Sequence, residues 1–287
     1  MVRAASIRVF LHEIRIEHTL FALPFAYTGA IFGAQGWPGI LPMFWITVAV
    51  LGARTAAMAA NRYLDREIDA RNPRTAQRAI PSGKLGPAIM LWAAAIGLLL
   101  LIVAATQLNP LCVKLLPIAA LGALLYPLCK RFTWLTHLVL GVVDALAPLG
   151  AFIAVTGTVN AVALLLFLAV MVWVGGFDIL YALMDLGVDR EQGIHSLPVR
   201  FGERAARNLP IALHGLMIVF LTIAGILGHA GWPYALGIVA AATLLIYEDW
   251  LVQKAHDIVA LNERIFTANM AFSGVFLATT LMAFTLA

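Results

Sequence analysis

Residues 185–202 read DLGVDREQGIHSLPVRFG, and they directly follow an apolar run over residues 160–184, NAVALLLFLAVMVWVGGFDILYALM. About 20 apolar residues are enough for a helix to cross a lipid bilayer, because each residue adds a rise of ~1.5 Å. The run therefore predicts a transmembrane helix. Two aspartates four positions apart, Asp185 and Asp189, follow it, with basic residues close behind. The sequence thus places an acidic cluster where a predicted transmembrane helix ends.

The rest of the chain has the same apolar character. Of its 287 residues, 62% are apolar and only 12% are charged, whereas about a quarter of the residues in an average soluble domain are charged. These numbers predict an all-α polytopic membrane protein, with one transmembrane domain over residues 1–287 and about nine transmembrane helices. The nine predicted spans are 20–36, 42–60, 86–107, 110–128, 134–156, 160–184, 208–229, 232–252 and 266–287.

The basic residues predict how the chain crosses the membrane, because Lys and Arg collect in cytoplasmic loops. With a cytoplasmic N-terminus, only Arg54 and Lys114 of the 19 Lys and Arg residues fall outside the cytoplasmic segments. The pI near 9.3 reflects this bias. Since no basic soluble module with interleaved aromatic residues is present, we expect no nucleic-acid partner.

A second acidic cluster matches the first. The loop after the second predicted span begins NRYLDREID at Asn61, and its Asp65 and Asp69 lie 120 positions before Asp185 and Asp189 (185 minus 65, 189 minus 69). Four predicted spans separate the two loops, so both emerge on the cytoplasmic face. A spacing of four places each pair on one face of a helix that extends past the membrane. The pattern predicts a weak parallel repeat, with motifs at 61–69 and 185–189.

Acidic pairs surrounded by arginines suit a metal diphosphate. Mg²⁺ is usually held by one or two protein carboxylates, while substrate phosphates and water complete its coordination. Two clusters can therefore hold two ions that share one diphosphate, and the phosphates also need cationic donors. A single acidic pair would be explained better by a solvated helix, and only the second pair at a matched position favours the metal site. The candidate phosphate donors in the cytoplasmic loops are Arg66, Arg74, Arg78, Lys130, Arg131 and Arg200.

Two other classes of membrane protein use acidic clusters. A secondary transporter also has internal repeats, but its coupling acids should lie near the membrane midplane, and two equal halves give an even number of spans. A membrane phosphotransferase that uses a nucleotide-activated alcohol should carry a D-G-x-x-A-R element, which this sequence lacks. Both alternatives fit the sequence less well than a metal-diphosphate site.

These residues resemble the UbiA superfamily of intramembrane aromatic prenyltransferases, which carry NDxxDxxxD after the second helix and DxxxD after the sixth. The segments RIEHTLFALPFA, NPRTAQRAIPSG, YPLCKRFT and GIHSLPVRFG are similar to the 4-hydroxybenzoate polyprenyltransferase branch and to naphthoate-prenylating enzymes of the futalosine route to menaquinone. One position departs from the motif, because Arg62 stands where many relatives have Asp. This substitution removes one carboxylate from the first cluster.

The resemblance implies a polyprenyl diphosphate donor, Mg²⁺ and an aromatic acid acceptor, either 4-hydroxybenzoate or a dihydroxynaphthoate, in quinone biosynthesis at a bacterial inner membrane. The donor's tail would lie towards membrane lipid, and Tyr126 would face the allylic cation with its ring, unless it is only an interfacial tyrosine. The implied metal ligands are Asn61, Asp65, Asp69, Asp185 and Asp189.

Arg54 is the one arginine within a predicted span, where a charge needs a partner. It lies on the same helix face as Asn61 and Asp65, two to three turns deeper. We expect it to bind the acceptor's carboxylate, and a buried ion pair with Asp144 is the alternative. Asp178, seven positions before Asp185, is expected to support the site or to pair with a buried polar neighbour.

Overall fold

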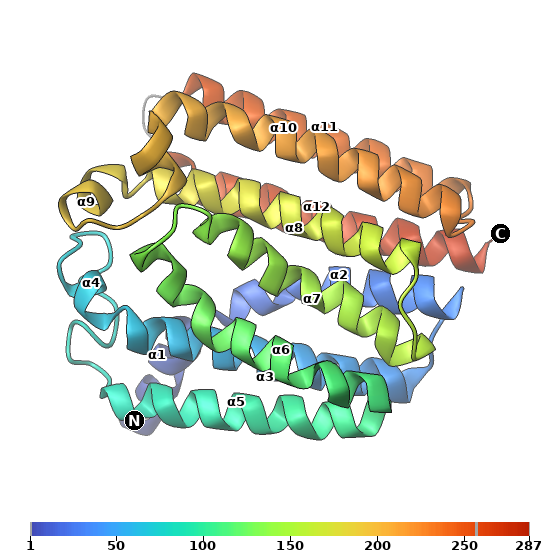
Figure 1. The fold of residues 1–287 in the computed structure, drawn as a ribbon, viewed down its shortest axis with the longest axis horizontal. Coiled ribbons are helices and arrows are strands. Elements are labelled where there is room, and N and C mark those ends of the chain that lie inside the picture. Colours follow the sequence, from blue (N-terminus) through green and yellow to red (C-terminus); the bar gives the residue numbers. More distant parts are fainter. Residues whose placement is uncertain (1, 256–257, 287) are drawn as a thin grey trace.

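The computed structural model describes the backbone of residues 2–255 and 258–286, and these residues form helices without any strand (Figure 1). In this described part, eight helices are long and apolar enough to cross a membrane. A ninth apolar segment, Ala22–Ala34, forms most of α2 and corresponds to the first predicted span. The predicted all-α, polytopic fold is therefore confirmed.

The long helices run side by side, while α4 and α9 lie together at one end of the bundle (Figure 1). The long helices are α2 (Ile16–Ala34), α3 (Ile40–Leu64), α5 (Pro87–Leu108), α6 (Pro110–Leu125), α7 (Thr136–Thr156), α8 (Ala161–Leu183), α10 (Leu197–Leu227), α11 (Trp232–Lys254) and α12 (Asn262–Thr285). The shorter elements are α1 (Val2–Glu13), α4 (Arg66–Ala70), η1 (Tyr126–Arg131), α9 (Leu186–Glu191) and η2 (Val259–Leu261).

Polar side chains cap the starts of three helices. Oδ1 of Asn109 accepts hydrogen bonds from the first N–H groups of α6, and Oδ1 of Asn160 accepts one from Ala163 N–H at 3.0 Å at the start of α8. Ser196 caps α10 in the same way. These bonds satisfy N–H groups that have no partner within their own helix. These three membrane helices therefore begin at defined residues, although the surrounding sequence is almost uniformly apolar.

Helix α8 lies in the core between α7 and α10. Its Trp173 is buried against Phe25 of α2 and Phe272 of α12, with ring centroids 4.7 and 5.3 Å apart. The indole N–H of Trp173 also donates to Oδ1 of Asn269 at 2.8 Å. The ring contacts and the hydrogen bond of Trp173 hold α8 in place against α2 and α12. The acidic loop therefore follows a helix that is firmly packed.

Both acidic motifs lie at breaks in the backbone rather than on continuous helices. α3 ends at Leu64 and α4 begins at Arg66, while Asp65 adopts φ −94° and ψ 1°. Asp185 occupies the matching position between α8 and α9, with φ −107° and ψ 6°. The predicted helical extension is therefore wrong at these two residues. One turn survives in each loop, since Asp69 N–H donates to Asp65 O and Asp189 N–H to Asp185 O, both at 2.8 Å.

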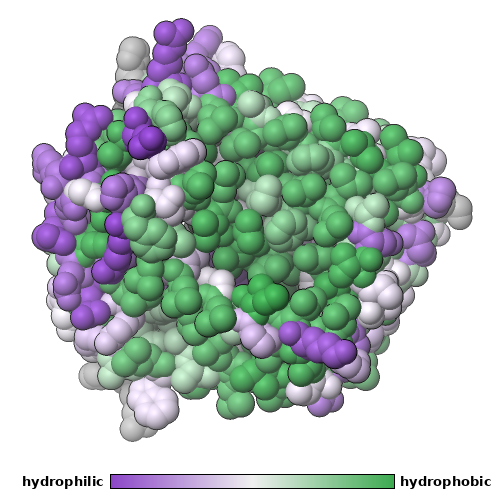
Figure 2. Space-filling view, in the orientation of Figure 1, coloured by the Kyte–Doolittle hydropathy of each residue, from purple (hydrophilic) through white to green (hydrophobic). Residues whose placement is uncertain are grey.

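The surface fits an integral, multi-pass membrane protein. Figure 2 shows hydrophobic side chains over the broad middle of one face, while hydrophilic side chains gather at the end that carries α4 and α9. Several large apolar side chains on the long helices are exposed, including Trp92 at 71% and Ile118 at 63%. An apolar band of this extent is suited to lipid, because large exposed apolar patches are rare on soluble monomers.

Candidate active site

A polar cavity of about 780 Å³ lies between α3, α7, α8 and α12, next to the two acidic loops. Its lining mixes charges of both signs almost evenly. The basic members are Arg15, Arg54, Arg62, Arg74, Arg78 and Lys130, and the acidic members are Asp144, Asp178, Asp185, Asp189 and Glu263. The structure therefore brings one predicted acidic pair and four of the predicted cationic residues into a single cavity.

Asp185 is bound by the loop that follows the first acidic motif. Arg74 donates from Nε to Oδ1 at 2.8 Å and from Nη2 to Oδ2, and Asn72 donates to Oδ1 at 2.9 Å. Burial alone would raise the pKa of Asp185, but the bonds from Arg74 and Asn72 outweigh it and lower that pKa. Asn72 was not predicted as a site residue, although it begins the quoted NPRT segment.

Asp189 has a different environment in the same cavity. Burial, with the neighbouring negative charge of Asp185, raises the pKa of Asp189 to about 6. No Lys or Arg side chain in the described part of the chain forms an ion pair with it. Its carboxylate therefore lines the cavity without a direct ion pair, although the charges of Lys130 and Arg74 act on it from a greater distance.

The first acidic pair lies behind cationic side chains. Lys130 Nζ is 2.5 Å from Oδ2 of Asp65, and Asn61 donates to the same oxygen at 3.0 Å. Arg78 Nη1 donates to both carboxylate oxygens of Asp69 at 2.7 Å. Burial raises the pKa of Asp65 despite the opposing charge of Lys130. Asp65 and Asp69 are only 1% and 6% exposed, so their cationic partners form the cavity wall in front of them.

The donors suit Mg²⁺ in kind, although no three metal-ligating side chains are gathered into a ready site within the described residues. Carboxylate and amide oxygens are the hard ligands that Mg²⁺ prefers. Oδ1 of Asp65 is buried and accepts no hydrogen bond from the described residues. A buried oxygen without a partner needs a donor or a cation. The residues therefore fit a divalent ion, provided that the aspartates are released from their ion pairs. This requires Arg74, Arg78 and Lys130 to bind phosphate oxygens in place of the carboxylates.

Arg54 forms the ion pair that was the alternative interpretation. Its Nη1 lies 2.8 Å from Oδ1 and 3.1 Å from Oδ2 of Asp144 on α7. Both side chains also line the polar cavity, as does Tyr126 at the start of η1. A guanidinium has five N–H donors, so the pair with Asp144 leaves donors for a second carboxylate. Binding of the acceptor by Arg54, and of the cation by Tyr126, stay predictions.

The structure does not bring three of the predicted phosphate donors into the cavity lining. Arg66 donates to Tyr63 O and to Glu67, on the outside of α4. Arg131 donates to Leu64 O at 2.6 Å, and the nearest approach of its Nη2 to Asp65 is 3.9 Å. Arg200 lies over the rings of Trp134 and Phe201, at 5.9 and 5.5 Å from their centroids. Their phosphate-binding roles remain predictions without a contact that supports them.

Arg200 is held apart from the cavity by a local break. Gly202 has φ +82° inside α10, a conformation that favours glycine. The segment from Leu197 to Phe201 therefore leaves the line of the membrane part of α10. This break explains why a basic residue close to the acidic motif in sequence faces aromatic side chains instead.

Sequence reasoning missed a histidine on the cavity wall. Nε2 of His137 accepts the N–H of Leu197 at 3.2 Å, so the ring proton resides on Nδ1, which lies 2.7 Å from Oδ2 of Asp178. This arrangement gives Asp178 a buried polar partner, one of its two expected roles. No spacing pattern indicated His137, because it reaches Asp178 from a different helix.

Arg62, the departure from the family motif, is a buried structural link. Its Nε donates to Glu13 O at 3.1 Å, and Nη1 donates to Oδ1 of Asn61 at 3.3 Å. Oε2 of Glu13 in turn accepts the N–H of Ala79 at 2.9 Å. Arg62 therefore joins the motif asparagine to α1 and to the loop that carries Arg74.

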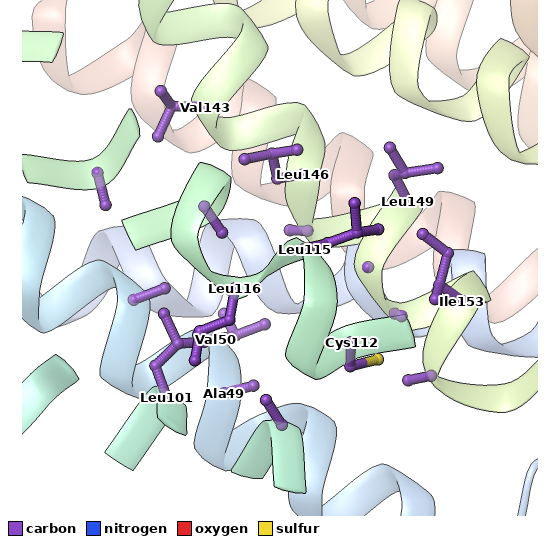
Figure 3. A pocket seen from close by; sticks show the side chains of 18 of the residues that line it. Ala49, Val50, Leu101, Cys112, Leu115, Leu116, Val143, Leu146, Leu149 and Ile153 are labelled. Carbon is purple, nitrogen blue, oxygen red and sulfur yellow. The ribbon is translucent and has the colours of Figure 1, made fainter. Parts of the chain in front are cut away.

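An apolar cavity of about 480 Å³ lies next to the polar one, between α3, α5, α6 and α7. Figure 3 shows its lining, with Val50 of α3, Leu101 of α5, Leu115 of α6 and Leu146 of α7. The two cavities share Arg54 and Asp144. A molecule with a charged head and a long apolar tail can therefore lie with its two ends in the two cavities.

Known proteins are similar over nearly the whole chain. The sequence profile of the UbiA prenyltransferase family matches residues 22–284. A 4-hydroxybenzoate octaprenyltransferase of Alkalilimnicola ehrlichii is 34% identical over 79% of this chain and 77% of that protein. The apo structure of a UbiA homolog from Aeropyrum pernix K1 has a TM-score of 0.84 and 30% identity, over 92% of this chain and 97% of that one. A UbiA homolog from Archaeoglobus fulgidus bound to GPP and Mg²⁺ shares the fold, with a TM-score of 0.75 and 15% identity, over 96% and 99% of the two chains.

Proposed function

The chain belongs to the UbiA prenyltransferase family, and from this premise we propose that it transfers a polyprenyl group from a polyprenyl diphosphate to an aromatic acid. The observation that carries the proposal is the junction of the polar and apolar cavities at Arg54 and Asp144. We favour 4-hydroxybenzoate as acceptor because relatives such as the Alkalilimnicola ehrlichii protein bear that name, and a dihydroxynaphthoate is the second candidate.

Mg²⁺ is the metal we assign to the polar cavity. A structural neighbour from Archaeoglobus fulgidus binds it together with GPP. Asp185 and Asp189 would hold the ion from the cavity side, and Asp65, Asp69 and Asn61 from the opposite loop. When bound, the ion supplies positive charge that stabilises the diphosphate as it leaves.

The cationic side chains of the cavity bind the donor's phosphates. Arg74, Arg78 and Lys130 each hold an aspartate in this structure, and each would donate to a phosphate oxygen if a metal held the carboxylate in its place. Charge-assisted bonds to phosphate are stronger than neutral ones. Binding of the donor therefore replaces one set of ion pairs by another inside the same cavity.

The transfer breaks the C–O bond between the prenyl group and diphosphate, and forms a C–C bond to the aromatic ring, which then loses a proton. The prenyl tail lies in the apolar cavity, so that its reactive carbon is near Arg54. Tyr126 faces the allylic cation with its ring, and the apolar walls keep water away from it. The remaining N–H donors of Arg54 hold the acceptor's carboxylate.

The position of the acids favours transfer over transport. Asp65, Asp69, Asp185 and Asp189 all lie beyond the ends of long helices, whereas a transporter needs its coupling acids near the midplane. We place the protein in a bacterial inner membrane with both acidic loops in the cytoplasm, because the Lys and Arg residues concentrate there.

Purified protein tests the proposed function directly. It is incubated with octaprenyl or geranyl diphosphate, Mg²⁺ and each aromatic acid in turn, and the products are identified by mass spectrometry. We expect a prenylated 4-hydroxybenzoate that disappears when EDTA removes the metal. Absence of product with every acceptor, from protein that is folded and metal-loaded, would overturn the proposal.

A further inference from the structure

A second polar cavity, of about 620 Å³, lies between α1 and the loop that follows α4. Its charge balance differs from that of the candidate active site, because six Arg or Lys side chains line it against one acid, Glu13. The polar cavity of the candidate active site, called the active-site cavity below, is lined by six Arg or Lys side chains and five Asp or Glu side chains. Such a one-sided lining creates a positive potential that concentrates anions. The basic members are Arg8, Arg15, Arg62, Arg74, Arg78 and Lys84.

Half of these cations are already neutralised. Arg62 lies beside Glu13, while Arg74 and Arg78 hold Asp185 and Asp69. Arg8, Arg15 and Lys84 form no ion pair with an acid in the described part of the chain. The basic cavity therefore contains three cations whose charge is not compensated locally.

The basic cavity lies next to the active-site cavity, and the two share a wall. Arg15, Arg62, Arg74 and Arg78 line both. At the outer side, Arg8 and Lys84 are exposed. The bond from Ala79 N–H to Glu13 joins α1 to the loop that carries Arg74 and Arg78, so both sides of the basic cavity are held together. The arginines thus form a series that runs from the acidic pairs to the surface.

We propose that this basic cavity binds a phosphate-type anion, and that its occupant is the diphosphate product on its way out of the active site. The inference rests on the proposed function, which releases diphosphate in each turnover. The apolar cavity offers this product no path, because a multiply charged anion is excluded from an apolar environment. Arg74 and Arg78 contact it first, and Arg8 and Lys84 receive it at the surface.

The headgroup of an anionic lipid has the same chemistry, since it also presents a phosphate to arginines. α1 carries Arg8 at the outer side of the cavity, where a headgroup could approach. The two sources of phosphate differ in one respect. Free diphosphate binds in a neutral bilayer, whereas a headgroup requires anionic lipid in the same bilayer.

The test uses the full chain in nanodiscs of phosphatidylcholine, with Arg8→Gln/Lys84→Gln as the variant. Both residues line only the basic cavity among the three cavities described. The control is Arg204→Gln/Arg264→Gln, which removes two exposed charges that line none of them. Binding of inorganic diphosphate is measured in EDTA, where the metal-dependent site is disabled, and inhibition by added diphosphate is measured during turnover with Mg²⁺.

We expect the variant to weaken metal-free diphosphate binding about tenfold, because two charge-assisted contacts are lost, while the control stays unchanged. The KM for the prenyl diphosphate should be the same in both. Equal diphosphate binding by variant and control would overturn the inference. If the difference between variant and control is present in phosphatidylcholine but disappears in discs with anionic phosphatidylglycerol, a headgroup occupies the cavity, and the release route is overturned. If transfer activity itself is absent, the proposed function fails, and the metal-free binding still tests the cavity.

Discussion

Arg74 binds Asp185 with two hydrogen bonds, so a residue of the first acidic loop holds the acidic motif of the second. The two residues are 111 positions apart, and Asn72 makes a third bond across the same boundary. The loop that follows the first motif is therefore in direct contact with the second motif. A change on either side should disturb both.

This coupling predicts the effect of removing single aspartates. Asp65→Ala and Asp185→Ala should each lower kcat by at least about a hundredfold, since charge stabilisation of the leaving group is lost. Prenyl transfer at limiting Mg²⁺ measures the effect, and membrane insertion of each variant is the control. Near-normal turnover in either variant would show that the four aspartates do not act as one metal-diphosphate unit.

Lys130 should bind donor phosphate. Its Nζ is 2.5 Å from Asp65 and lines the active-site cavity. Lys130→Gln is expected to raise the KM for prenyl diphosphate about tenfold, and to raise that for the aromatic acid less. Arg200→Gln is the matched comparison, because the sequence indicates a phosphate role while the structure places the side chain over two rings. An equal rise in both variants would mean that Arg200 reaches the donor during turnover.

Much of this arrangement could be predicted from the sequence, because length and hydropathy are local properties. The apolar runs predict the helices, and the spacing of Asp65 and Asp69 predicts that they share one side. The break at Asp65 could not be predicted, since NRYLDREID contains no breaker. The carboxylate at the break is instead held by Lys130, 65 positions away.

Contacts between residues far apart in the sequence could not be predicted either, because they depend on how the helices pack. His137 and Asp178 are 41 positions apart and meet because α7 packs on α8. The sequence predicts the pairing of Arg54 with Asp144 only as an alternative. Any charge within a membrane span needs a partner, but which partner it meets depends on how the helices pack. From the sequence, Arg62 indicates only that the first cluster lacks one carboxylate. In the structure, it also links α3 to Glu13 of α1.

Arg62 should contribute more to stability than to chemistry. Its side chain and that of Glu13 are about 6% and 5% exposed, and Arg62 Nε lies 3.2 Å from Glu13 Oε1. Removing one member of a buried pair leaves an uncompensated charge, which costs roughly 3–5 kcal/mol. Arg62→Met should therefore lower the Tm in detergent strongly, and adding Glu13→Gln should recover part of the loss. Additive effects of the two changes would argue against a coupled pair.

The last prediction separates the two roles of Arg54. Arg54→Lys keeps the positive charge and can still pair with Asp144, but it loses the planar fork that holds a carboxylate in a bidentate manner. If Arg54 binds the acceptor, the KM for the aromatic acid should rise about tenfold, while the KM for prenyl diphosphate and the Tm stay nearly unchanged.

Asp144→Asn is the matched variant, since it removes the observed partner of Arg54 and leaves the guanidinium in place. Because an unpaired buried cation attracts a carboxylate more strongly, this variant should lower the KM for the aromatic acid or leave it unchanged, at some loss of Tm. If both variants instead lower the Tm alike and neither changes the KM for the acceptor, Arg54 serves only to pair with Asp144, and another group must bind the carboxylate.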